Sequence, residues 1–217
     1  MTTVDIRIIF VIHIFLILLC AVVMVFLWWQ NRKRFPEIGL WLADYILQFA
    51  AIIFITLRGI LPDLISVILA HIIIISGTIM LYIGLGRYVG RESRQWHNYV
   101  MLIVFTIVHA YLTYVYPDIE LRTVNSSLAL IYIYSQCAWL MLRGVAPDLR
   151  PASRMTGIVF SLFCLVGVIQ ITVNLSLPRT NDLFVTGFVN LYAIITFQIL
   201  FVALTFALFL MVSRRLS

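Results

Sequence analysis

Three histidines, His13, His71 and His109, lie inside long apolar stretches of the chain. In its predicted helix, each lies about seven residues from the helix end on one and the same side of the bundle. At the helical rise per residue, this places all three about 10 Å below that side. Ionisable side chains are costly inside a membrane and mark candidate functional sites there. Three imidazoles at one depth can bind a metal ion or haem, carry a proton or contact a ligand. Each can equally form a hydrogen bond across a helix bundle, because no two share a helix at ligand spacing.

Other polar side chains fall near the same helix ends. Arg122 opens an apolar stretch directly after a turn at 117–120, where its guanidinium can hold a carboxylate or phosphate, or pair with Asp118 or Glu120. The connecting segments at this end are short, so a ligand must be small and lie among the helix ends. The candidate ligand-binding residues are His13, Arg58, Asp63, His71, His109, Arg122 and Asn125.

A second group of polar residues is predicted to serve signalling or packing. Asp44 lies about one turn into the second apolar stretch, where a carboxylate can relay protons or, as we favour, pair with Arg34 or Arg87. Asn190 and Gln198 in the last stretch suit hydrogen bonds between helices, which contribute about 0.6 kcal/mol each in membranes. We predict no catalytic residue and no metal ligand within residues 1–217.

The composition shows what surrounds these side chains. Hydrophobic residues make up 63% of the 217 and charged residues 11%, whereas soluble domains carry about 25% charged residues. The solvent over most of the surface must therefore be lipid. At about 20 residues per crossing, we predict an all-α bundle of seven transmembrane helices at Ile6–Trp29, Gly39–Leu57, Leu64–Gly86, Asn98–Tyr116, Leu121–Leu142, Arg154–Asn174 and Leu183–Val212.

The cations orient this bundle, because Lys and Arg concentrate on the cytoplasmic side of membranes. The sparse side carries Arg7, Arg58, Arg122 and Arg179. We therefore expect the amino terminus outside the cell and the carboxyl terminus in the cytoplasm. The rich side carries Arg32, Lys33, Arg34, Arg87, Arg91, Arg94, Arg143, Arg150, Arg154, Arg214 and Arg215.

Several functional classes lack their residues in this sequence. The last helix has no lysine for a retinal Schiff base, and the single lysine is Lys33. Neither a Ser/His/Asp set nor a phosphate-binding glycine loop is present, so we expect no self-contained enzyme. The scattered cations do not predict nucleic-acid binding. Cys20, Cys137 and Cys164 lie in apolar stretches and are expected to act as small hydrophobic residues.

Two alternatives remain open at this point. The segment Leu57–Leu64 is similar to Leu142–Leu149, 85 residues later, and both follow a predicted helix. Copies separated by three helices would be inverted, which is typical of transporters, although shared turn chemistry explains the similarity as well. A small transporter or channel is one alternative, and a haem- or metal-binding protein that uses the three histidines is the other.

The last apolar stretch favours a sensor instead. It runs 30 residues from Leu183 to Val212 and is followed by Arg214 and Arg215. A long helix that leaves the membrane through charged residues is typical of receptors that pass a movement to a cytoplasmic partner.

A set of residues and short motifs between positions 41 and 122 forms a pattern. Its members are Trp41, Leu57-Arg58-Gly59 with Pro62, Ser66, Gly84-Leu85-Gly86-Arg87, Gly90-Arg91, and Pro117 followed by Arg122. With these features, the run from 41 to 91 resembles the amino-terminal seven-helix sensor region of bacterial GGDEF-domain proteins, the diguanylate cyclases. His71 departs from this pattern, which more often has asparagine there.

The resemblance implies a signal-input module in the bacterial inner membrane. Residues 1–212 would form the sensor domain, and residues 213–217 would begin a linker to a cytoplasmic output domain. That domain would dimerise and convert GTP, with Mg²⁺, into cyclic di-GMP, so these cofactors belong to it and none is expected in this region. The expected partners are the lipid bilayer, a second copy of the chain and a small ligand at the outer face.

Overall fold

The computed structural model describes residues 6–91, 94–145, 150–176 and 183–216, with side chains described in these ranges except at 6–8, 10, 183–191 and 216. This part of the chain folds into helices only, apart from an isolated bridge between Arg58 and Leu61. Each predicted helix is present, with ends within four residues of the predicted ones. The elements are α1 (Ile6–Asn31), α2 (Ile38–Thr56), the π-helical turn η1 (Leu64–Leu69), α3 (Ala70–Tyr88), α4 (Trp96–Tyr114), α5 (Ile119–Arg143), α6 (Arg150–Ser176) and α7 (Leu183–Leu216).

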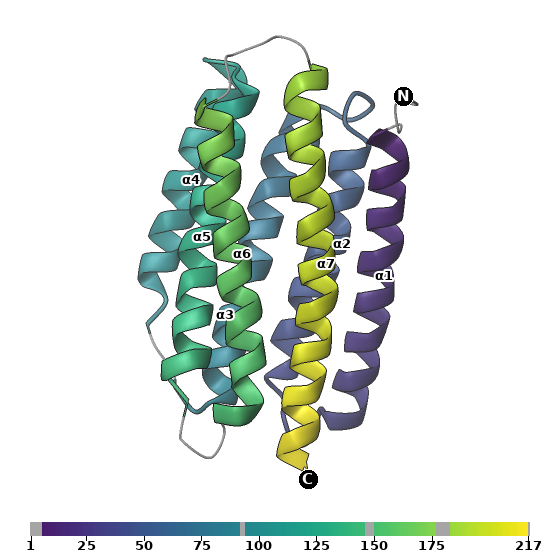
Figure 1. Ribbon diagram of the computed structural model, residues 1–217, viewed down its shortest axis with the longest axis vertical. Helices are drawn as coiled ribbons and strands as arrows, with labels where there is room; N and C mark the ends of the chain where they lie inside the picture. The colour runs from purple at the N-terminus through teal and green to yellow at the C-terminus, as the bar shows by residue number, and fades with distance from the viewer. Residues whose placement is uncertain (1–5, 92–93, 146–149, 177–182, 217) are drawn as a thin grey trace.

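Successive helices run antiparallel, so the two ends of the chain lie at opposite ends of the bundle (Figure 1). The helices α1, α2, α3, α5, α6 and α7 form a closed ring, in which α5 and α6 pack most extensively. The helix α4 lies against α5 and the start of α3. Since α3 packs against α2, α4 and α5, it links two parts of the bundle.

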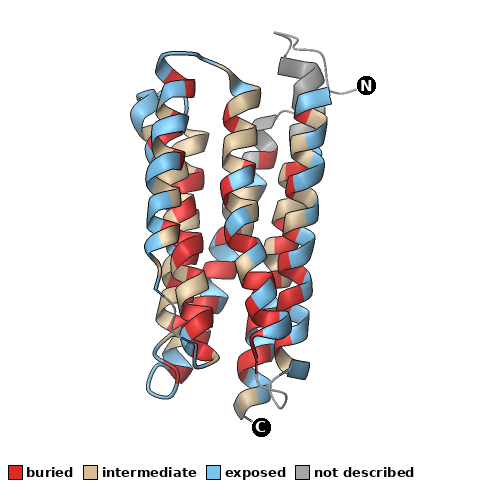
Figure 2. Cartoon of the chain, turned by 90° about the vertical axis from the view of Figure 1, so that its left-hand side faces the viewer, coloured by how far each residue is buried: buried red, intermediate tan, exposed pale blue. Residues whose placement is uncertain are grey.

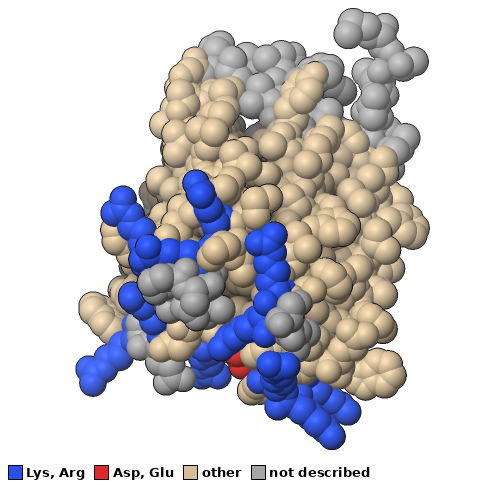
Figure 3. Space-filling model, turned by 60° about the horizontal axis from the view of Figure 1, so that its bottom comes forward, with Lys and Arg blue, Asp and Glu red and all other residues tan. Residues whose placement is uncertain are grey.

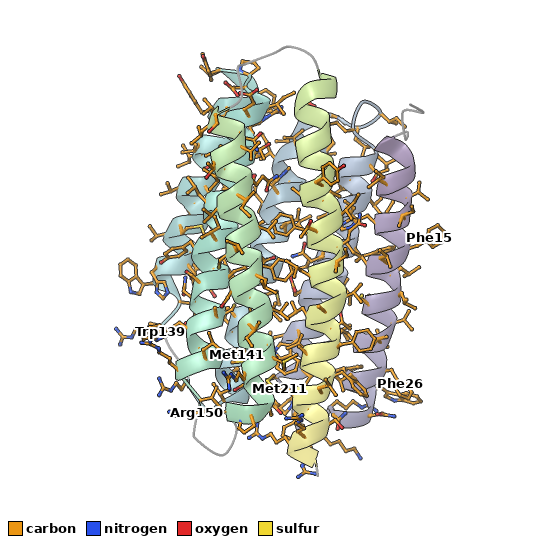
Figure 4. The ribbon with its side chains drawn as sticks, viewed as in Figure 1. Phe15, Phe26, Trp139, Met141, Arg150 and Met211 are labelled. Atoms are coloured by element: carbon orange, nitrogen blue, oxygen red, sulfur yellow. The ribbon has the colours of Figure 1, made fainter. Side chains whose placement is uncertain are left out.

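The outer surface is apolar. Side chains exposed on the helices include Phe15 and Phe26 of α1, which point away from the bundle in Figure 4. Figure 2 shows buried residues along the inward faces and exposed residues along the outward ones. Among the described residues, five helices are both long enough and apolar enough to cross a membrane: α1, α2, η1 with α3, α6 and α7. The chain is therefore a helical protein built for a membrane, as predicted.

The closest helix packing joins α2 to α3. A Cβ atom at Gly84 would lie 2.6 Å from the Trp41 ring, and one at Gly77 would lie 2.7 Å from a carboxylate oxygen of Asp44. The two glycines are seven residues apart, so they lie on one face of α3. Small residues let helices approach closely in membranes, where packing rather than the hydrophobic effect holds helices together.

The carboxyl-terminal end of α7 is tied to α3. The Arg215 guanidinium lies 4.5 Å from the centroid of the Tyr88 ring and 5.0 Å from that of Phe35. It also donates a hydrogen bond of 2.6 Å to the Tyr88 carbonyl. The Tyr88 hydroxyl in turn donates to the Met211 carbonyl at 3.2 Å. We call these four residues the Arg215 clamp.

The two similar segments that suggested a transporter adopt different conformations at their glycines. Gly59 has φ +92°, in the left-handed region that favours glycine. Gly144 has φ −77° and ψ −13° and is right-handed. Residues 146–149 of the second copy lie outside the described residues, so the comparison stops at this glycine. The identical residues of the two segments therefore do not give the same backbone conformation at the glycine.

The contact at Gly84 predicts that Gly84→Leu destabilises the bundle by about 1–3 kcal/mol, the usual cost of overpacking. Thermal unfolding of the purified protein in detergent measures the change. Ser161→Leu adds a comparable volume at an exposed position of α6 and serves as the control. Equal midpoints for the two variants would contradict the close approach of α2 and α3.

Candidate functional site

The helix that continues into α3 begins with a wide turn. In η1, the backbone bonds skip one residue more than in an α-helix, and such turns are frequent at functional sites. The Ser66 hydroxyl donates to the Pro62 carbonyl at 3.2 Å. His71 follows two residues after the turn, and its Nδ1 donates to the Val67 carbonyl at 2.7 Å. This bond fixes the ring orientation and leaves Nε2 as an acceptor.

His71 of α3 meets His109 of α4. Their ring centroids are 4.6 Å apart, and His109 also stacks on Phe105 at 5.0 Å. His109 is 1% exposed, yet neither of its ring nitrogens has a hydrogen-bond partner among the described residues. An unsatisfied buried polar group costs about 1–3 kcal/mol. The protein thus maintains an imidazole that packing alone does not require.

A cavity of about 420 Å³ lies beside these rings, within the range of small-molecule sites. Five of the seven predicted ligand-binding residues line it, although sequence alone could not show which helices face one another. They come from five different helices or from the segments next to them. These residues are His13, Arg58, His71, His109 and Arg122.

Unpaired polar atoms gather around this cavity. His13 Nδ1, both ring nitrogens of His109 and the Ser126 hydroxyl are buried without a hydrogen-bond partner in the described chain, and all three residues line the cavity. Native proteins satisfy the large majority of their buried polar atoms. Four such atoms on one cavity indicate a site that water or a ligand completes.

Charge is also present at the cavity. Arg122 lies in the first turn of α5 and is buried. Asp63 and Asp118 attract its guanidinium, while Arg58 repels it. The Asp118 side chain caps α5 by accepting from the Leu121 amide at 2.9 Å. The cavity therefore has a buried cation that nearby carboxylates partly balance.

The two remaining predicted ligand-binding residues do not line the cavity. Asp63 is exposed at the start of η1 and acts on the site through its charge on Arg122. Asn125 donates to the Phe105 carbonyl at 3.3 Å and so joins α5 to α4 beside His109. Both residues support the walls rather than the cavity surface.

Several polar residues that line the cavity were not among the predicted ligand-binding residues. Ser126 lines the cavity, and Ser127 next to it donates to the Gln170 side chain at 3.1 Å across the interface of α5 and α6. The signal was present, because Asn125, Ser126 and Ser127 are three consecutive polar residues near the start of an apolar stretch. Only the packing shows that Ser126, Ser127 and Gln170 of α6 line one cavity.

The predicted pairing of Asp44 with an arginine is wrong. Its buried carboxylate accepts from Gln48 Nε2 at 2.9 Å, on the next turn of α2. Gln48 Nε2 also lies 3.2 Å from the Ile74 carbonyl and 3.4 Å from the Thr78 hydroxyl of α3. Asp44 is thus bonded to a side chain of its own helix, and Gln48 joins α2 to α3.

The last helix carries the other two residues predicted for packing. Gln198 is buried, but its amide nitrogen has no partner among the described residues, so the expected hydrogen bond through that nitrogen is not formed. The side chain of Asn190 lies outside the described residues.

The haem- or metal-binding alternative stays a prediction. Within the described ranges, no three His, Cys, Asp or Glu side chains gather closely enough to hold a metal ion.

Comparisons of the chain with protein-family profiles, with curated proteins and with solved structures give no match. The kind of ligand that the cavity can bind therefore follows from the atoms that line it.

Because the ring nitrogens of His109 have no hydrogen-bond partner among the described residues, we expect His109→Phe to change the free energy of unfolding by no more than about 0.5 kcal/mol, or to raise it. Phe105→Ala, which removes a buried ring from the same stack, should cost about 3–5 kcal/mol. Thermal unfolding of both variants in detergent checks this pair. A large loss of stability in His109→Phe would show that the imidazole serves the fold.

Proposed function

We propose that the chain is a signal-input domain that binds a small ligand in the histidine-lined cavity and controls a cytoplasmic output domain. The observation that carries this proposal is the course of α3. His71, near its first residues, lines the cavity, and Tyr88 at its last residue belongs to the Arg215 clamp. A rigid helix thus joins the cavity to the end of the helix that would lead to the output domain.

All seven helices cross the membrane in this proposal. The helices α4 and α5 are 19 and 25 residues long and lie alongside the five more apolar helices. Their polar residues turn inward, since Asn98 of α4 and Arg122 and Ser127 of α5 are buried. Burial inside the bundle removes the main obstacle to placing such residues in lipid.

The distribution of cations supports the orientation. Figure 3 shows Lys and Arg side chains gathered over the end of the bundle that carries the carboxyl terminus. Eleven of the fifteen cations in the sequence belong to the helix ends and loops on that side. By the preference of Lys and Arg for the cytoplasmic side, this end faces the cytoplasm and the cavity lies in the outer half.

The cavity favours a small ligand that has both an apolar part and a polar group. Its walls include aliphatic side chains such as Ile52 and Ile75, and its unpaired atoms are imidazole nitrogens and a hydroxyl. A ligand can switch the domain only if it binds one arrangement of the helices more tightly than another. The wide turn η1 beside His71 is the element most suited to rearrangement.

The resemblance to sensor regions of diguanylate cyclases supplies the proposed output. The reading frame would continue past Ser217 into a GGDEF domain, and two copies of the chain would bring two such domains together. To test this proposal, the full-length gene is expressed in cells and the cellular level of cyclic di-GMP is measured. A frame that ends at Ser217 would contradict a covalently attached output.

The Arg215 clamp predicts the effect of one substitution on this output. A cation–π contact contributes about 0.5–2 kcal/mol, so Arg215→Gln should shift the balance of two signalling states by roughly twofold to thirtyfold. Arg214→Gln is the matched control, because Arg214 is exposed and its guanidinium makes a long bond of 3.4 Å to the Pro151 carbonyl. Equal cyclic di-GMP levels in both variants and the wild type would contradict a role of the clamp in signalling.

A further inference from the structure

A second cavity lies at the other end of the bundle, between α3, α4 and α5. Its volume is about 650 Å³. Its lining includes Arg87 and Arg91 at the end of α3, Tyr99 of α4, and Gln136 and Trp139 of α5. The proposed function makes no use of it, because the Arg215 clamp lies on the other side of α3, against α7 and Phe35.

The turn after α3 brings two cations to this cavity. The Gly90 amide donates to the Arg87 carbonyl at 3.0 Å, and the Arg91 amide donates to the Gly86 carbonyl at 2.8 Å. This pair of bonds is a Schellman motif, and Gly90 adopts the left-handed conformation it requires, with φ +73°. A Cβ atom at Gly86 would lie 2.7 Å from the Arg91 carbonyl, so glycine is needed there as well.

The opposite wall is polar and fixed. Gln136 of α5 donates to the Asn98 side chain at 2.9 Å and accepts from it at 3.4 Å. Asn98 also donates to the Gln95 side chain at 2.7 Å, and His97 lies 3.2 Å from the Gln136 oxygen. These bonds hold α4 against α5, and the side chains of Gln95 and Gln136 line the cavity together with the two arginines.

The outer rim of the cavity is aromatic and faces the surroundings of the bundle. Trp139 is 61% exposed and Tyr99 is 52% exposed, and Figure 4 shows Trp139 on the outside of the bundle. Trp and Tyr concentrate at the level of lipid headgroups. Since α3 packs only loosely against α4, the space between them is accessible from the lipid side.

We propose that this cavity binds the headgroup of an acidic phospholipid. Arg87 and Arg91 would hold the phosphate, and Ile83 and Trp139 would contact the acyl chains. Basic pockets between transmembrane helices on the cytoplasmic side have the charge and position to bind anionic headgroups. A phospholipid fits better than a free phosphate ion, because the exposed Tyr99 and Trp139 form the outer rim and the apolar Ile83 and Leu140 also line the cavity.

The test titrates purified protein in detergent with dioleoylphosphatidylglycerol and measures by native mass spectrometry the fraction that keeps one lipid. We expect saturable retention of this lipid and much weaker retention of dioleoylphosphatidylcholine. The double variant Arg87→Gln/Arg91→Gln should need on the order of tenfold more phosphatidylglycerol for half-occupancy, because two cations near the headgroup are lost. Ser135→Phe should weaken retention too, by filling the cavity from α5 with both arginines intact.

The pair Arg32→Gln/Lys33→Gln removes the same charge from exposed positions at the same end and should leave retention unchanged. Equal losses in the two double variants would show attraction by overall charge and overturn the site. Unchanged retention in Arg87→Gln/Arg91→Gln or in Ser135→Phe would overturn it as well. Displacement of the lipid by millimolar inorganic phosphate would identify a phosphate-ion site and reject the phospholipid.

Discussion

The close approach of α2 and α3 is the interaction on which the rest of the structure depends. It needs Gly77 and Gly84, which leave room for Asp44 and for the Trp41 ring. In lipid, helices gain little from the hydrophobic effect, so such close packing and a few hydrogen bonds must hold the bundle together. With α2 on one side and α5 on the other, α3 is held along its length. Its two ends can therefore carry different tasks.

Polar groups are used differently along this frame. Several buried polar atoms around Asp44 and in the Arg215 clamp have partners on another helix. Gln48 Nε2 lies 3.2 Å from the Ile74 carbonyl of α3, and the Tyr88 hydroxyl donates to the Met211 carbonyl of α7. Around His109 such atoms have no partner among the described residues. Because unpaired polar atoms are costly away from water, the four that line one cavity support the proposal that a ligand binds there. The same contrast separates the histidine-lined cavity from the hydrogen-bonded wall of Asn98 and Gln136.

Sequence analysis predicted the features that follow from composition, but it missed the contacts that depend on how the helices pack. Helix positions and the cation-rich end follow from apolar length and charge alone. Helices that are apolar nearly all round do not show which face is buried, so the contact of His71 with His109 and the burial of Trp41 could not be derived. The partner of Asp44 was wrong for the same reason, since depth along a helix says nothing about its neighbours. The π-helical turn has no sequence signal beyond Pro62.

The central claim is that the histidine-lined cavity faces outward and the Arg215 clamp faces the cytoplasm. Two variants test it, each with one added cysteine, Ile60→Cys or Lys33→Cys. Both positions are exposed and lie at opposite ends of the bundle. Spheroplasts that carry each variant are treated with a membrane-impermeant maleimide. The wild type, with Cys20 and Cys137 buried, gives the background. The account predicts that Ile60→Cys is labelled on intact spheroplasts and that Lys33→Cys is labelled only after lysis. The reverse pattern would contradict it.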